Sequence, residues 1–118
     1  MLASEVPREQ WQHFFERFNL QHAGARARVE RHQPGVGIIF EIDNCVFQRI
    51  HDDFSGEHHR LGIVVGEPRE HQETFLMTDP RQLLWSQNED EAVHTLQIHG
   101  TDGRCLVIRL MAKTKAAA

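Results

Sequence analysis

Residues 7–32, PREQWQHFFERFNLQHAGARARVERH, change their hydrophobic period halfway along, and this change predicts the fold class. In the first half, aromatic residues recur at the spacing of one helix face; they are Trp11, Phe14, Phe15 and Phe18. We expect this amphipathic helix to begin at Pro7, whose missing N–H suits the first helical position, and to end at Gly24. Its aromatic face is expected to pack in the core.

After Gly24 the period falls to two, which is typical of half-buried β-strands. Residues 25–30 alternate small or apolar side chains with charged ones, and Pro34-Gly35 predicts a turn. Residues 38–42 alternate again, and a turn at Asp43-Asn44 is expected to separate them from a further strand that starts at Cys45.

The C-terminal segment HTLQIHGTDGRCLVIRL, residues 94–110, predicts a hairpin whose register follows from its apolar residues. A two-residue turn would place Leu96 opposite Arg109. A three-residue loop over 101–103 instead pairs Ile98 with Leu106, and it needs Gly103 in the left-handed conformation. The apolar pairing favours the three-residue loop.

The remaining segments complete an α+β fold. Residues 73–77 predict a strand that Asp79-Pro80 ends, and residues 82–86 fit a helix or a strand, with a strand favoured. The predicted strands do not alternate with helices, so a parallel sheet is not expected. We therefore expect one domain over residues 1–118, in which the N-terminal amphipathic helix packs on a curled or barrel-like, mostly antiparallel sheet of six to seven strands. Residues 1–6 and 112–118 are expected to be loose tails.

Composition excludes some functions. Residues 51–110 carry five Arg against eleven acidic residues, and the net charge is −4, so the chain lacks the basic face that nucleic-acid binding requires. No apolar run reaches the ~20 residues of a membrane span, and the N-terminus does not resemble a secretory signal. We expect a cytoplasmic protein without nucleic-acid or membrane partners, with Cys45 and Cys105 as separate thiols.

The segment HDDFSGEHHR, residues 51–60, holds the densest group of metal-ligating side chains. A two-residue turn at Ser55-Gly56 would place Ile50 opposite Leu61, and therefore Asp53 opposite His58 and His51 opposite Arg60. His51, Asp53 and His58 would then share one face as ligands for zinc or another divalent transition metal. Arg60 on the same face opposes a cation, so ion pairs at a solvated hairpin end are the competing interpretation.

Other catalytic motifs are missing. The sequence contains no GxSxG, GxGxxG or P-loop, and EPREHQE over residues 67–73 matches neither HExxH nor HxxEH. A Cys–His dyad is conceivable for Cys45 or Cys105 because the chain has nine histidines, but that abundance makes the proximity of the two residue types uninformative. The sequence therefore assigns no catalytic residue and no cofactor.

Several motifs together resemble a family of small, mostly bacterial proteins, domain of unknown function 5335. They are PREQWQHFFERF, His22-Ala23-Gly24, GIVVGE, TDP and LQIHGTDGRCLVIRL, and they span about residues 7–110. The resemblance implies no activity, and the histidine-rich segment 51–60 lies outside its pattern.

Three functions follow as hypotheses. The first is a small non-catalytic binding or regulatory module that acts through a protein partner or as a homodimer, because one helix cannot cover a whole apolar sheet face. The alternative is a metal-binding protein or metal-dependent enzyme that uses the hairpin 51–60. The third is a pH-responsive accessory protein, which rests only on the nine histidines.

Overall fold

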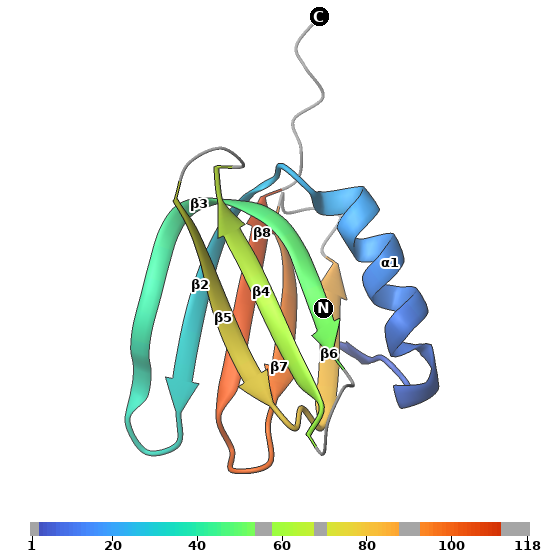
Figure 1. Ribbon diagram of the computed structural model, residues 1–118. Helices are drawn as coiled ribbons and strands as arrows, with labels where there is room; N and C mark the ends of the chain where they lie inside the picture. The colour runs from blue at the N-terminus through green and yellow to red at the C-terminus, as the bar shows by residue number, and fades with distance from the viewer. Residues whose placement is uncertain (1–2, 54–57, 68–70, 88–92, 112–118) are drawn as a thin grey trace, which may run out of the picture.

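The computed structural model describes residues 3–53, 58–67, 71–87 and 93–111 (Figure 1). A single helix, α1 (Trp11–His22), follows a 3-10 turn, η1 (Arg8–Gln10). The strands are β1 (Ser4–Glu5), β2 (Arg26–Gln33), β3 (Gly37–Asp53), β4 (Arg60–Gly66), β5 (Gln72–Thr78), β6 (Gln82–Gln87), β7 (Val93–His99) and β8 (Cys105–Met111). No helix in the described part of the chain is long and apolar enough to cross a membrane.

All eight strands form one antiparallel sheet in the order β1-β6-β7-β8-β2-β3-β4-β5. This confirms an α+β fold with an N-terminal helix and an antiparallel sheet. The strand count is higher than predicted, and the expected barrel-like closure is wrong because the end strands β1 and β5 do not pair. The loose tail predicted for residues 1–6 is also wrong in part, since Ser4 and Glu5 pair with β6.

Strand β3 corrects the turn predicted at Asp43-Asn44. It continues through these residues, and its first half pairs with β2 while its second half pairs with β4. Asn44 takes a left-handed φ of 54°, its N–H bonds Asp43 Oδ1, and the register with β2 shifts between Ala27 and Val29. Asn tolerates this backbone well, so the chain forms a bulge that bends the strand instead of reversing it.

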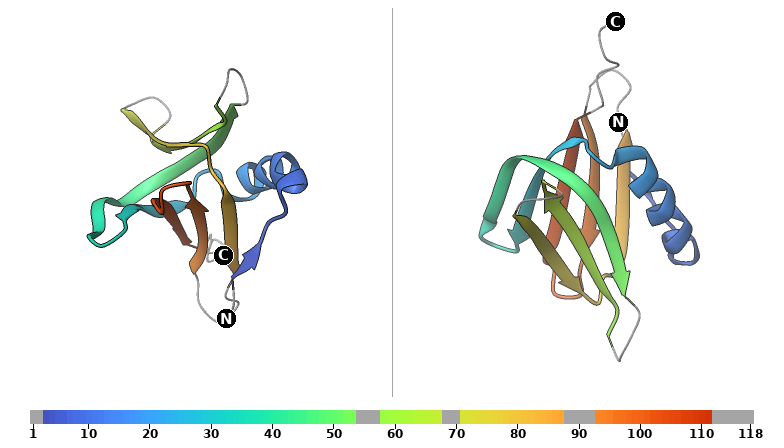
Figure 2. Two further views of the ribbon diagram at one scale, coloured as in Figure 1. Left: turned by 90° about the horizontal axis from the view of Figure 1, so that it is seen from below. Right: turned by 45° about the horizontal axis from the view of Figure 1, so that its top comes forward.

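The bend in β3 folds the sheet into two layers (Figures 1 and 2). The back layer holds β1, β6, β7, β8, β2 and the first half of β3, and the front layer holds the rest of β3 with β4 and β5. Helix α1 lies beside both layers, where Phe18 contacts Phe47 of β3 and Trp85 of β6. The core between them includes Trp11, Phe15, Phe18, Val29, Phe47, Ile63, Leu83, Leu96 and Ile108.

Two local predictions are confirmed. The β7–β8 hairpin pairs Ile98 with Leu106, and Gly103 in its loop has a φ of 82°. Residues 82–86 lie within strand β6. Gly24 also has the left-handed φ expected after the helix, 86°, and its N–H bonds the carbonyl of Phe47.

Asn19 joins α1 to the backbone of β3. Its Nδ2 donates to the carbonyl of Ile50 at 3.1 Å, and its Oδ1 accepts from the N–H of Ile50 at 2.7 Å. Strand β2 pairs with β3 only as far as Val46, so these groups of Ile50 have no β2 partner. The amide of Asn19 therefore takes the place of a neighbouring strand at Ile50.

We predict that Asn19→Ala lowers the free energy of unfolding by about 2 kcal/mol, because it leaves two half-buried backbone groups without partners. Urea denaturation followed by circular dichroism measures the loss. Gln12→Ala, an exposed change on the same helix, is the control and should stay within about 0.5 kcal/mol of the parent. Equal effects of the two substitutions would contradict the role assigned to Asn19.

Candidate functional site

The β3–β4 hairpin carries the predicted metal ligands, and its predicted register is wrong by two residues. Asp53 pairs with Arg60, and His51 pairs with Gly62, while the predicted turn at Ser55-Gly56 lies outside the described residues. A shift of two residues keeps every side chain on its original face, so apolar alternation cannot distinguish the two registers. In the observed register Ile50 pairs with Ile63, and both are buried.

The histidines of this hairpin bond to carboxylates of different segments. His58 Nδ1 lies 2.9 Å from Asp79 Oδ2, whereas His59 Nε2 lies 2.5 Å from Asp52 Oδ1. Among the residues that the structure describes, no three His, Cys, Asp or Glu side chains are grouped to hold a metal ion. Metal binding by His51, Asp53 and His58 thus stays a prediction for which the described residues show no assembled ligand group.

His59 instead belongs to a contact that the sequence did not reveal. The Arg8 guanidinium stacks over the Trp11 ring at 4.4 Å, donates to the Pro80 carbonyl at 2.8 Å and lies 3.3 Å from His59 Nδ1. Arginine only donates, so His59 Nδ1 accepts and its Nε2–H donates to Asp52. These contacts link η1 to the β3–β4 hairpin. The residues lie far apart in the sequence, so no local pattern predicts the contact.

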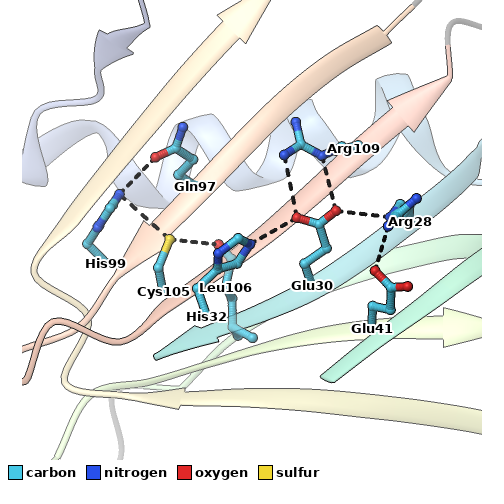
Figure 3. Close-up of polar contacts among 9 residues, drawn as sticks. All are labelled: Arg28, Glu30, His32, Glu41, Gln97, His99, Cys105, Leu106 and Arg109. Carbon is cyan, nitrogen blue, oxygen red and sulfur yellow. Dashed lines mark hydrogen bonds and ion pairs between the residues drawn. The ribbon is translucent and has the colours of Figure 1, made fainter. Parts of the chain in front are cut away.

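The outer face of the back layer holds a charged group centred on Glu30 (Figure 3). Glu30 is 3% exposed and is the one buried charged residue in the described part of the chain. Arg28 Nε and His32 Nε2 each lie 2.9 Å from its carboxylate, and Arg109 donates twice at 3.4 Å. Arg28 also pairs with Glu41. The group joins β2, β3 and β8 across the sheet.

The partners of Glu30 keep it ionised. Burial raises its pKa, but the hydrogen bonds from His32 and Arg109 and the charges of Arg109 and Arg28 lower it more. The pKa of Glu30 therefore lies below its ordinary value of 4.5. A buried carboxylate with this many donors is a satisfied structural anion, with little capacity to accept a proton at neutral pH.

A Cys–His pair of the kind considered in the sequence analysis, Cys105 and His99, lies on the same outer face of the back layer as Glu30 (Figure 3). Cys105 Sγ lies 3.7 Å from His99 Nε2, which also lies 2.9 Å from Gln97 Oε1. Burial raises the pKa of Cys105 to about 11 and lowers the pKa of His99. Both groups are therefore neutral near pH 7, and the thiol lacks the activation that a nucleophilic cysteine needs.

A groove of about 390 Å³ lies between α1 and β6. Three aromatic side chains, Phe14, Phe18 and Trp85, line it and contact one another edge to face or tilted, with ring centroids 5.2–6.0 Å apart. The aromatic face predicted as core is confirmed for Trp11, Phe15 and Phe18, which are buried, whereas Phe14 is only partly buried.

The polar lining of the groove is neutral or cationic. Among the described residues it consists of Gln10, His13, Arg17, Gln21 and Gln87, and none of these carries a carboxylate. Arg17 and His13 are exposed, and neither forms an ion pair with another described residue. The described lining therefore places one fixed positive charge, that of Arg17, beside aromatic rings.

Comparison with known proteins gives a family and no activity. Residues 2–118 match the family model described as "Family of unknown function (DUF5335)". No curated protein and no solved structure matches the chain. The match covers essentially the whole sequence, so the resemblance expected from the sequence motifs is confirmed.

We predict that Glu30→Gln lowers the free energy of unfolding by about 1–2 kcal/mol at pH 7, because Arg28 and Arg109 lose their shared anion. The pKa of Glu30 is lower in the folded state, so its stabilisation is complete above pH 4.5 and disappears as the pH falls through the folded value. Urea denaturation from pH 7 to pH 3 should show the parent and variant curves converging. Glu41→Gln, in an exposed partner of Arg28, is the control and should have a smaller effect.

We also predict that neither thiol reacts appreciably with 5,5′-dithiobis(2-nitrobenzoate) at pH 8 in the folded protein. Both cysteines are buried, and burial raises the pKa of each. Unfolding in urea should accelerate the reaction by at least ~100-fold, since the thiolate fraction and access both rise. A native thiol that reacts within seconds would restore the Cys–His dyad as a catalytic candidate.

Proposed function

The chain belongs to the DUF5335 family, for which no function is described, so we propose its function from the geometry of the groove. We propose a small non-catalytic binding module that holds an aromatic carboxylate between α1 and β6. The observation that carries this proposal is the combination, in one groove, of three aromatic side chains with the exposed guanidinium of Arg17, which forms no ion pair with another described residue.

Each part of the lining matches one part of such a ligand. A planar ring can stack on Phe14 or Trp85, whose ring centroids lie 6.0 Å apart in an edge-to-face arrangement. Arg17 presents paired N–H donors that suit a carboxylate. Trp85 also carries an indole N–H, which forms no hydrogen bond with another described residue.

The size of the groove also fits a small molecule. A volume of about 390 Å³ lies within the range of ~300–1,000 Å³ common for small-molecule sites. The helical lining runs from Gln10 to Gln21, which corresponds to about 16 Å of helix.

The side chains that line the groove favour binding over chemistry. None of the described lining residues is Ser, Thr, Cys, Lys, Asp or Glu, so this part of the lining offers no hydroxyl or thiol nucleophile and no carboxylate base. Outside the groove, burial raises the pKa of Cys45 and Cys105. These observations support the non-catalytic part of the proposal.

Titration with cinnamate, followed by amide and indole resonances in NMR, tests the proposal. We expect a dissociation constant of about 1 mM or tighter for this small ligand. The indole N–H of Trp85 should shift, whereas that of Trp11, which is buried and bonded to the Val6 carbonyl, should not. Arg17→Gln should weaken cinnamate binding about 10-fold, because it removes the charged partner of the carboxylate.

Two controls separate the groove from general attraction to positive charge. Arg81→Gln changes an exposed arginine outside the groove and should leave cinnamate binding unaltered. Cinnamamide, the uncharged analogue, should bind the parent and Arg17→Gln equally. Weaker cinnamate binding in Arg81→Gln would refute the groove as the binding site. So would a titration in which the indole N–H resonance of Trp85 does not shift.

A further inference from the structure

Strand β5 is an open edge of the sheet. It pairs with β4 from Arg60–Thr78 to Gly66–Gln72 and has no other strand partner in the described chain. The segment QETFLMT contains no proline or lysine, and one of its seven residues is charged. Long, regular and apolar edges of this kind are surfaces on which another strand can pair.

Two hydrogen bonds show which backbone groups of β5 point away from β4. The N–H of Asp79 bonds the carbonyl of His59, so the odd-numbered residues face β4. The carbonyl of Leu76 instead accepts from the Arg31 guanidinium at 3.2 Å, so the even-numbered residues face the open edge. The edge-facing backbone groups therefore belong to Gln72, Thr74, Leu76 and Thr78.

Exposed apolar side chains flank the same edge. Leu76 on β5 is 54% exposed, and Phe40 on β3 is 48% exposed while its ring lies 5.5 Å from that of Phe75. The front layer ends at β5, and the two layers diverge on the side away from α1 (Figure 2). A further strand on β5 would cover both side chains.

We propose that this edge is an interface at which β5 of one copy pairs antiparallel with β5 of a second copy. The twofold axis passes at Phe75. This register pairs Thr74 with Leu76 and Gln72 with Thr78 of the partner, which uses all four edge-facing residues and forms about eight backbone hydrogen bonds. The contact is isologous, so it closes as a dimer.

Charge favours this register. Glu73 faces Met77 of the other copy, and His71 faces Asp79 beyond the paired strands. Centring the pair on Leu76 would instead set Glu73 against Asp79, two like charges directly opposite each other. The Phe75 rings of the two copies meet at the axis, each beside the Phe40 ring of its own copy.

Arg31 controls access to the edge. Its bond to the Leu76 carbonyl occupies the group that Thr74 of the second copy would bind. Arg31 forms no ion pair with another described residue, so among the described residues the polar contact that holds it at this edge is the bond to the Leu76 carbonyl. The dimer must release it, and removing it should strengthen association.

Sedimentation equilibrium from about 1 to 300 µM tests the interface. The parent should show a monomer–dimer equilibrium, and Arg31→Ala should tighten it several-fold. Thr74→Pro removes an edge-facing N–H without touching the β4 ladder and should weaken the dimer about 30-fold, since each dimer loses two bonds. Arg49→Ala and Thr74→Ala are the controls and should behave as the parent.

Mixed disulfides test the register. Thr74→Cys and Leu76→Cys proteins should cross-link to each other when mixed under oxidation, and neither should cross-link efficiently alone. If Thr74→Pro does not fold, as circular dichroism would show, Leu76→Lys places a charge on the edge and should dissociate the dimer instead. A strict monomer for both the parent and Arg31→Ala, or a dimer unaffected by folded Thr74→Pro and by Leu76→Lys, would overturn the proposal.

Discussion

The bulge at Asp43-Asn44 is the feature on which the rest of the structure depends, because it lets one strand serve two layers. Asn44 adopts a left-handed φ, and β3 bends from its pairing with β2 to its pairing with β4. Beyond Val46 the edge of β3 is left without β2, and α1 fills this gap through Asn19 and the backbone around Gly24. The helix is thus held where its aromatic face closes the core, and its flank forms one wall of the groove.

Elements defined by local chemistry could be predicted from the sequence. The aromatic spacing of α1, the left-handed Gly24 and the loop at Gly103 each depend on residues close together in the chain, and the structure confirms them. Asp43-Asn44 could not be resolved in the same way, because a turn and a bulge use the same backbone conformation. The β3–β4 register could not be resolved either, since a shift of two residues preserves both faces of the hairpin.

The candidate sites could not be predicted from the sequence for a different reason: they depend on contacts that no local pattern encodes. The histidines of residues 51–60 were conspicuous in the sequence, but their bonds run to Asp79 and Asp52. The groove depends on Trp85 lying next to Phe14 and Phe18, residues about seventy positions away, and no local pattern encodes that contact. Phe14 belongs to an ordinary core-facing stripe in the sequence, so its partial exposure in the groove could not be predicted from the helix alone.

Both proposed surfaces follow from one imbalance between the layers. The front layer has the second half of β3 with β4 and β5, whereas the back layer spans β1, β6, β7, β8, β2 and the first half of β3, so the front layer leaves both flanks of the core open. On one flank α1 covers the opening, and because a helix packs on a strand only through side chains, a groove remains beside β6. On the other flank nothing in the described chain follows β5, and an unpaired backbone edge remains. The first flank therefore offers side-chain chemistry that suits a small ligand, and the second offers main-chain hydrogen bonds that suit another strand. Because the core separates the two flanks, loss of one function by mutation need not alter the other.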